Sequence, residues 1–275
     1  MTQIAVYTDL DGSLLDHHDY SHAAADSLLQ ALEKQDIPVI PVSSKTRAEL
    51  LPLRKELNNR HPFIVENGAA VFIPQGYFAE QPAETITQNG YWVKVFTSPR
   101  SHWLDKIDAI AADFPDAFIN FARLDINTII DLTGLNPVAA QQASEREFGE
   151  PVHWLGSDTD QTRFVTALEQ AGANVLRGGR FLHISGNCGK GRALLWLNEQ
   201  YKKQPHGIDP ISIAIGDSQN DVAMLEAADH ALIIRSPSHQ PPVLSRNKNS
   251  SLSHSQGPTG WDEGLRKILH SLNNQ

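Results

Sequence analysis

Short apolar runs alternate with amphipathic stretches in the first part of the chain. Residues 4–7, 37–42 and 62–65 are apolar runs of strand length, and residues 21–35 and 47–58 carry apolar side chains at helical spacing. Strands that alternate with helices along a chain usually form a parallel sheet. The pattern therefore predicts an α/β domain built on a parallel sheet.

The middle of the chain has a different pattern. We expect strands at residues 91–96, 128–132, 174–177 and 180–185, and helices at residues 100–113, 136–148 and 158–171. Gly178 and Gly179 separate the last two strands, and such a dipeptide is a strong signal for a β-hairpin. Hairpins beside helices predict an inserted α+β domain, which we place at residues 83–186.

The opening pattern resumes after the insert. The expected elements are a helix at residues 190–200, strands at 211–215 and 231–234, a short helix through Met224 and Leu225, and a closing helix at 261–272. Residues 236–260 are rich in Ser, Pro, Asn and His and are expected to form a long loop, which is usually either functional or mobile. Residues 1–82 and 187–275 would then form one discontinuous domain.

Composition narrows the class of protein. The chain has 275 residues, 40 % of them hydrophobic, which is enough for one large domain or two modest ones. A net charge of −9 argues against a broad surface for nucleic acid or for an acidic membrane. Cys188 is the only cysteine, and neither a signal segment nor a membrane-spanning run is visible. We expect a cytoplasmic protein.

Acidic residues follow the first predicted strand. Asp9 and Asp11 stand just after residues 4–7, and Gly12 allows the chain to turn sharply. Ligands of open α/β sheets bind just beyond the carboxyl ends of the strands. One carboxylate there can attack an electrophile while the other carries a proton, and carboxylate oxygens suit Mg2+. A strand that ends in a solvated turn is the alternative, because Asp and Gly are common in turns.

Polar residues also follow the next two strands. Ser43 and Ser44 can cap a helix, or they can bind phosphate together with backbone N–H groups at a helix N-terminus. Glu66, Asn67 and Gly68 can form a turn or line a binding site. These residues are expected at the same edge of the sheet as the aspartates.

Two later segments add a lysine and further acids. Lys190 begins a predicted helix, where a solvated lysine is the alternative. Asp217 and Asp221 lie in the segment Gly-Asp-Ser-Gln-Asn-Asp at residues 216–221, after a buried-type strand. Asp221 could also be an ordinary acid in a first helical turn, where the helix dipole favours it.

These segments resemble the four motifs of the haloacid dehalogenase (HAD) superfamily of phosphatases. The motifs are residues 9–13 (Asp-Leu-Asp-Gly-Ser, with Ser13 where Thr is usual), Ser43, Lys190 and residues 216–221. The resemblance implies a Rossmann-like core with a parallel sheet. It also implies that the α+β insert is a cap of the C2 type, as in Cof-like (subclass IIB) phosphatases.

A closer resemblance is to the family of mannosyl-3-phosphoglycerate phosphatases. It rests on residues 43–46 (Ser-Ser-Lys-Thr), 62–68, 177–181 and 257–261. It implies hydrolysis of mannosyl-3-phosphoglycerate or glucosyl-3-phosphoglycerate. The alternatives are a Cof-like or sucrose-phosphate-phosphatase-like enzyme for another sugar phosphate, and a phospho-acceptor without turnover.

The resemblance also implies roles for the motif residues. Asp9 would form an aspartyl-phosphate, Asp11 would act as general acid and base, and Ser43 and Lys190 would hold phosphoryl oxygens. Asp9, Asp217 and the backbone carbonyl of Asp11 would bind Mg2+. The residues that would support the metal or the lysine are Asp221, Ser218 and Asn220.

Substrate contacts are implied for both parts of the chain. The expected substrate-binding residues are Ser44, Lys45, Glu66, Asn67, Gly68, Arg177, Gly178 and Arg180. We expect the cations Lys45, Arg177 and Arg180 to bind the carboxylate of a phosphoglycerate. The expected partner is a small phosphorylated sugar, with no nucleic acid and no membrane, and the oligomeric state is left open.

Overall fold

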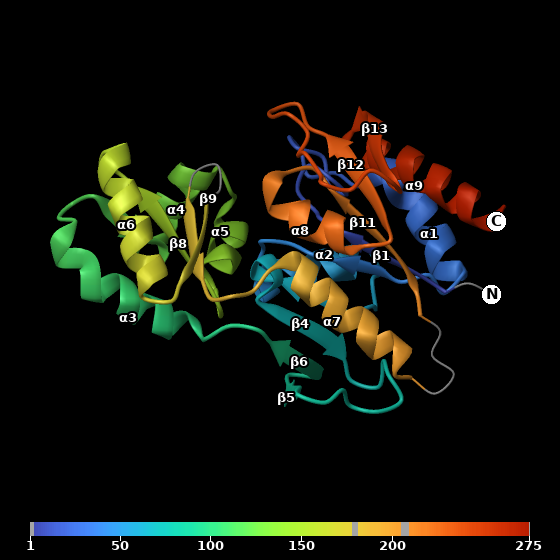
Figure 1. Ribbon diagram of the computed structural model, residues 1–275, viewed down its shortest axis with the longest axis horizontal. Coiled ribbons are helices and arrows are strands. Elements are labelled where there is room, and N and C mark those ends of the chain that lie inside the picture. Colours follow the sequence, from blue (N-terminus) through green and yellow to red (C-terminus); the bar gives the residue numbers. More distant parts are fainter. Residues whose placement is uncertain (1–2, 178–180, 205–208, 275) are drawn as a thin grey trace. The chain divides into compact units, whose positions relative to one another are not determined.

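The computed structural model describes residues 3–177, 181–204 and 209–274 (Figure 1). The chain forms two compact units. The first consists of Met1–Ser43, Asn59–Lys94 and Gly189–Gln275, and the second of Ser44–Asn58 and Val95–Cys188. The second unit contains most of the predicted insert, and the predicted boundaries at 83 and 186 remain a prediction. No helix within these described ranges is long and apolar enough to cross a membrane.

A five-stranded parallel sheet lies at the centre of the first unit. Its order is β13-β12-β11-β1-β2, with β1 at Ile4–Thr8, β2 at Val39–Pro41, β11 at Ile211–Gly216, β12 at His230–Arg235 and β13 at Ser250–Gln256. Strand β1 is buried along its whole length, as expected for a central parallel strand. The predicted α/β class with a parallel sheet is confirmed.

Helices complete this unit. They are α1 (Asp26–Lys34), α7 (Lys190–Lys202), α8 (Val222–Ala227) and α9 (Gly257–Asn273). Helix α9 packs on β12 and β13, and α8 packs on β11 and β12 (Figure 1). Trp261 of α9 is fully buried. The predicted helices in this part of the chain are confirmed, although α9 begins at Gly257 instead of Trp261.

The prediction of one long loop at residues 236–260 is wrong in its second half. Strand β13 pairs with β12 in parallel, with Ser250 opposite Ala231 and Leu252 opposite Ile233. Most side chains of β13 are exposed, so an edge strand of this kind depends on backbone pairing and carries no apolar pattern. Residues 236–249 contain no helix or strand.

A second sheet in the first unit is antiparallel. Its order is β3-β4-β6-β5, with β3 at Phe63–Val65, β4 at Ala70–Pro74, β5 at Ile86–Gln88 and β6 at Tyr91–Val95. The sequence analysis did not predict β4 and β5. Strand β3 pairs antiparallel with β4, and only the bridge between Val42 and Ile64 continues the parallel arrangement.

The second unit contains a four-stranded antiparallel sheet. Its order is β7-β8-β10-β9, with β7 at Phe118–Asn120, β8 at Glu150–Trp154, β9 at Asn174–Arg177 and β10 at Leu182–Ser185. Helices α3 (Arg100–Ile110) and α6 (Asp158–Gln170) bury aromatic and aliphatic side chains against it. The predicted pairing of β9 with β10 is confirmed. Its turn at Gly178 and Gly179 lies outside the described residues.

The remaining helices of the second unit correct one prediction. They are α2 (Arg47–Glu56), α4 (Ile126–Thr133) and α5 (Pro137–Ser144). Residues 128–132, predicted as a strand, lie within α4. The Asp125 side chain accepts a hydrogen bond from the Thr128 N–H, and Gly134 ends the helix in the left-handed conformation. These two caps, together with burial of Ile129, outweigh the intrinsic preference of the segment.

Candidate active site

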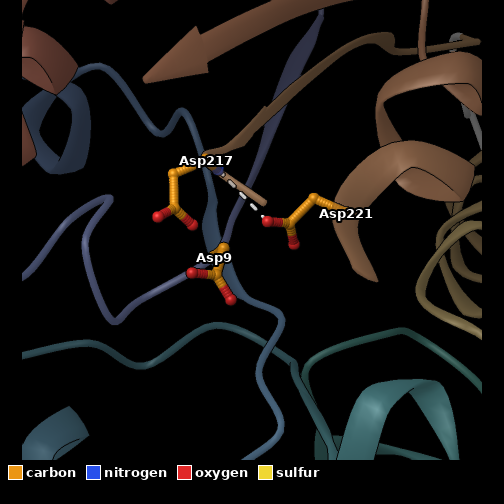
Figure 2. A group of neighbouring side chains, drawn as sticks. All are labelled: Asp9, Asp217 and Asp221. Atoms are coloured by element: carbon orange, nitrogen blue, oxygen red, sulfur yellow. Dashed lines mark hydrogen bonds between the residues drawn. The ribbon is translucent and has the colours of Figure 1, made fainter. Parts of the chain in front are cut away.

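Three buried aspartates meet at the carboxyl ends of β1 and β11. Asp9 directly follows β1, Asp217 directly follows β11, and Asp221 ends the short turn that leads into α8. One oxygen of each carboxyl group lies within 4.8 Å of the others, and Figure 2 shows the groups turned toward one another. The sheet thus brings together residues more than half the chain apart, as the rule for α/β strand ends predicts.

A buried lysine compensates part of this negative charge. Lys190 is 1 % exposed, and its Nζ lies 2.6 Å from Asp9 Oδ1 and 2.6 Å from Asp221 Oδ1. Burial lowers the pKa of Lys190, but the carboxylates of Asp221 and Asp9 outweigh it and raise that pKa above its usual value. The lysine is therefore a charged, internal partner of the aspartates and not a solvated residue at a helix start.

Asp221 is engaged on both carboxylate oxygens. Oδ1 accepts from Lys190, and Oδ2 accepts from the backbone N–H groups of Asp217 and Ser218, each at 3.1 Å. Gly216 makes room for this arrangement, because a Cβ there would lie 2.5 Å from Asp221 Cβ. With its acceptors used in this way, Asp221 is suited to orient Lys190 and the Asp217 backbone.

The turn at Glu66, Asn67 and Gly68 joins several parts of the site. All three residues have positive φ, and the turn is buried. The Asn67 N–H donates to the Ser43 carbonyl at 2.9 Å, and the Asn220 side chain donates to Asn67 Oδ1 at 3.3 Å.

Gly68 allows this turn to approach helix α7. A Cβ at Gly68 would lie 2.3 Å from the carbonyl carbon of Gly189, the residue before Lys190. The turn therefore touches the segments that carry Ser43, Asn220 and Lys190. Its predicted contact with substrate remains a prediction.

Asp9 has a further support that the sequence did not indicate. The Trp261 Nε1–H donates to Thr8 Oγ1 at 2.9 Å, and the Thr8 hydroxyl donates to the Asp9 carbonyl at 2.7 Å. Both side chains are fully buried. Helix α9 is thereby linked to the backbone of the candidate nucleophile.

Asp217 has a partner outside the motifs. His239 Nε2 lies 3.2 Å from Asp217 Oδ2. Burial and the neighbouring Asp221 raise the pKa of Asp217 to about 6, while His239 acts in the opposite direction. The sequence analysis did not select His239; its only signal was a histidine within the polar segment that was expected to be functional or mobile.

The other predicted residues are distributed over both units. Ser43 is buried after β2, and Asp11 is half-buried in the turn after β1. Ser44, Lys45 and Arg177 belong to the second unit, where the Ser44 carbonyl accepts from Arg146 and Arg177 is exposed at the end of β9. Gly178 and Arg180 lie outside the described residues.

The donor set fits a divalent cation. Three carboxyl groups lie together and one ammonium group contacts two of them, so acidic groups outnumber the buried cation. Oxygen ligands of this kind select hard cations. Asp9 and Asp217 are the better ligands, because the oxygens of Asp221 already accept from Lys190 and from backbone N–H groups.

Known proteins resemble the chain in sequence. A family model described as haloacid dehalogenase-like hydrolase matches residues 6–88. A glucosyl-3-phosphoglycerate/mannosyl-3-phosphoglycerate phosphatase of Methanococcoides burtonii is 33 % identical over 273 residues, 98 % of each chain. The protein of the same name from Persephonella marina is 32 % identical, again over 98 % of each chain.

Solved structures resemble it in fold. The sucrose-phosphatase of Synechocystis sp. PCC6803 aligns with a TM-score of 0.63 and 16 % identity over 98 % of each chain. A HAD subclass IIB sugar phosphatase aligns with a TM-score of 0.65 and 11 % identity, over 97 % of this chain and 99 % of the other. At these identities the likeness shows the shared fold.

Sheet order, the aspartates at the strand ends and these similarities define a phosphatase of the haloacid dehalogenase superfamily with the subclass IIB fold. Within this superfamily, the chain belongs to the family of phosphatases that contains the two relatives from M. burtonii and P. marina. This family implies a divalent metal at the aspartates.

Proposed function

We propose that the protein hydrolyses glucosyl-3-phosphoglycerate and mannosyl-3-phosphoglycerate to the glycosylglycerate and inorganic phosphate. The names of the two relatives support this substrate, since both align with the chain over both of its units. The observation that carries the chemistry is the Asp9 carboxylate, buried at the end of β1 with the Lys190 ammonium 2.6 Å away.

In the first step, the Asp9 carboxylate attacks phosphorus, and the bond from phosphorus to the glycerate oxygen breaks. Asp11 donates its proton to that oxygen, so the glycosylglycerate leaves with a neutral hydroxyl group at that position. Lys190 and Ser43 hold the phosphoryl oxygens, and Asp221 keeps Lys190 in place. The product of this step is an aspartyl-phosphate on Asp9.

In the second step, Asp11 takes a proton from water, and the water oxygen attacks phosphorus. The bond to Asp9 breaks, which restores the carboxylate and releases phosphate. When bound, Mg2+ offsets the charge of the carboxylates and of the phosphoryl group. Asp9, Asp217 and the Asp11 carbonyl would hold it.

The test is phosphate release from a panel of substrates. The panel contains both glycosyl-3-phosphoglycerates, 3-phosphoglycerate, sucrose 6-phosphate and hexose 6-phosphates. We expect kcat/KM for the glycosyl-3-phosphoglycerates to exceed that for sucrose 6-phosphate and the hexose 6-phosphates, which have no carboxylate, by at least about tenfold, since one charged contact to the carboxylate accounts for such a factor. 3-Phosphoglycerate keeps the carboxylate, so its kcat/KM measures the contribution of the sugar. Exhaustive chelation should remove the activity, and added Mg2+ should restore it.

Another sugar phosphate is the second candidate substrate. The likeness to the sucrose-phosphatase structure favours it, although that likeness concerns the fold. The same panel separates the two candidates. If sucrose 6-phosphate or a hexose phosphate is hydrolysed as fast as the glycosyl-3-phosphoglycerates, the proposed substrate is wrong while the proposed chemistry stands.

A further inference from the structure

Residues 257–261, which form the first turn of α9, take no part in the proposed reaction steps. They place Trp261 in the core of the first unit, where its side chain is fully buried. Gly260 makes this packing possible, because a Cβ there would lie 2.2 Å from the Ser255 carbonyl oxygen of β13. The start of α9 thus lies tightly against β13, and the Trp261 indole reaches Thr8 on β1.

The hydrogen bonds from Trp261 to Asp9 have a single direction. The Trp261 Nε1–H donates to Thr8 Oγ1 at 2.9 Å, and the Thr8 hydroxyl donates to the Asp9 carbonyl at 2.7 Å. An indole N–H can only donate and a carbonyl oxygen can only accept, so the hydrogen of the Thr8 hydroxyl lies toward Asp9. These two hydrogen bonds are called the Trp261–Thr8 link below.

The Trp261–Thr8 link holds a peptide group at the point where the chain leaves the sheet. The pairing of β1 with β2 and with β11 ends at Thr8. The Asp9 N–H still donates to the Ile215 carbonyl at 2.8 Å, whereas the Asp9 carbonyl accepts from the Thr8 hydroxyl. The backbone is therefore held on both sides of the Asp9 Cα atom, which limits the positions open to the carboxylate.

The neighbours of Asp9 make such a support necessary. Oxygens of Asp217 and Asp221 lie within 4.8 Å of an Asp9 oxygen, and like charges at such distances repel one another. Lys190 attracts the Asp9 carboxylate at 2.6 Å. Since these forces act in different directions, a small rotation of the Asp9 peptide is enough to turn the carboxylate away from its line of attack.

We propose that Thr8 and Trp261 are positioning residues, which fix the Asp9 peptide and thereby the direction in which the carboxylate approaches phosphorus. Both act on the backbone of Asp9. A misplacement of about 1 Å can lower a rate about a hundredfold, so loss of the link slows the chemical step. Substrate binding should change little, because other residues hold the substrate. This inference rests on the role of Asp9 in the proposed function.

The first experiment removes the Thr8 hydroxyl. Thr8→Val keeps nearly the shape of threonine but cannot form the link, whereas Thr8→Ser keeps the hydroxyl. With p-nitrophenyl phosphate and with a glycosyl-3-phosphoglycerate, we expect Thr8→Val to lower kcat by at least about tenfold and to change KM by less than about twofold. Thr8→Ser should keep kcat within about threefold of the wild type. A wild-type kcat in Thr8→Val would overturn the proposal, and so would equal losses in the two variants.

The second experiment tests whether Trp261 acts through Thr8. Trp261→Phe keeps an aromatic ring and loses the N–H, so it should lower kcat by about three- to tenfold. The double variant with Thr8→Val should lose no more than Thr8→Val alone, because the link is already broken. Multiplied losses would show that Trp261 contributes by packing, which would overturn the link. If Thr8→Val does not fold, Trp261→Phe and its control decide the question.

The control is Trp103→Phe in the second unit. Trp103 is 3 % exposed, and its Nε1–H donates to the Ser98 carbonyl at 3.2 Å. Loss of this comparable hydrogen bond should lower stability in urea titrations and leave the kcat of the folded protein unchanged. Equal losses of kcat in Trp103→Phe and Trp261→Phe would overturn the positioning role, because the effect of Trp261 would then be a general loss of structure.

The proposed function and the positioning roles fail in different ways. If the wild type releases no phosphate from any substrate, the assigned reaction falls and this inference falls with it. If the wild type releases phosphate and Thr8→Val does so at the same rate, only the positioning roles fall.

Discussion

The glycines of positive φ serve different purposes in the two units. In the first unit, a Cβ at Gly12 or Gly68 would lie within 3 Å of atoms from a segment of the site that is distant in sequence. In the second unit, Gly134 and Gly172 also have positive φ, but no atom lies within 4 Å of where their Cβ would be. A glycine of positive φ permits a turn in both units, and at these two positions of the first unit it also permits close contact between segments distant in sequence.

The buried charged residues also differ between the two units in the partners that they contact. In the second unit, the buried Glu150 accepts from Arg100 Nε and from the Ala122 N–H. Its oxygens are thus held by groups that connect α3, the segment after β7, and β8. In the first unit, Asp9, Asp217 and Asp221 face one another, and Lys190 contacts Asp9 and Asp221. We therefore propose that the buried charge of Glu150 serves stability, whereas that of the aspartate cluster serves chemistry.

The largest effect is expected for Asp9→Asn in the first unit. An amide cannot act as the nucleophile, so kcat should fall by at least about a thousandfold. The melting temperature should stay the same or rise, because the substitution removes one of three clustered negative charges while Lys190 keeps Asp221. Phosphate release and thermal unfolding measure the two effects. Wild-type turnover in a clean preparation would refute the role of Asp9.

Glu150→Ala in the second unit should have the opposite effects to Asp9→Asn: it should lower stability and leave kcat unchanged. It leaves the Arg100 guanidinium inside the protein without its carboxylate, which costs about 3–5 kcal/mol of unfolding free energy. The kcat of the protein that remains folded should be unchanged. Urea titration and initial rates test this pair of outcomes. A large fall in kcat with normal stability would contradict the assignment of a stabilising role to Glu150.

His183 in the second unit should make the free energy of unfolding depend on pH. Burial, and to a lesser degree Arg146, lowers the pKa of His183 to about 4 from an ordinary value of 6.5. The unfolded state then binds a proton that the folded state does not, so stability is complete above pH 6.5 and is lost as the pH falls toward 4. The full loss is about 3 kcal/mol.

Urea titrations over this pH range test the His183 prediction. His183→Gln should flatten the pH dependence, and the exposed His254→Gln should not. If both variants keep the wild-type slope, another group is responsible for the loss of stability in acid.

Gly68→Ala should reduce catalysis more than the same change at Gly134. The added methyl group would meet the backbone of Gly189, so the start of α7 and with it Lys190 must shift. A misplacement of about 1 Å can cost about a hundredfold in kcat. Gly134→Ala strains only a helix end and should cost about 1–2 kcal/mol of stability with kcat retained. Equal kcat values for the two variants would show that the close approach at Gly68 is unimportant for the site.

The smallest effect concerns the predicted carboxylate contact of Arg177. Arg177→Ala should lower kcat/KM for a glycosyl-3-phosphoglycerate by about tenfold, and should change kcat/KM for p-nitrophenyl phosphate, which has no carboxylate, much less. Arg163→Ala is a control from the same unit, where Arg163 is also exposed. A proportional loss on both substrates would assign Arg177 to folding or to phosphate alone.

The sequence predicts best where burial dictates residue type. Strands β1 and β11 are buried and apolar, and the polar residues that end them could be found from their position alone. Strand β13 could not be found, because its exposed serines reflect backbone pairing at an edge. Segment 128–132 was mistaken for a strand because the caps at Asp125 and Gly134 decide its conformation.

In the site, too, the sequence reveals residues in local patterns and misses those that are placed by the path of the chain. Asp9, Lys190, Asp217 and Asp221 belong to recognisable motifs, and the structure brings all four together. His239 is a single histidine in a Ser- and Pro-rich segment, so no spacing or periodicity distinguishes it from the other histidines. Its place beside Asp217 depends on the path of residues 236–249, and no local pattern encodes that path.

The order of strands in the parallel sheet has a consequence for biosynthesis. Strand β1 lies between β2 and β11, and Ile4 pairs with Ile211. The ribosome must therefore make most of the polypeptide before β1 gains its second neighbour. Until then, one edge of an apolar strand is open to other nascent chains, a state that favours aggregation and chaperone binding. A polypeptide released before residue 211 keeps that open edge and lacks Asp217, so we expect truncated products to aggregate and to be inactive.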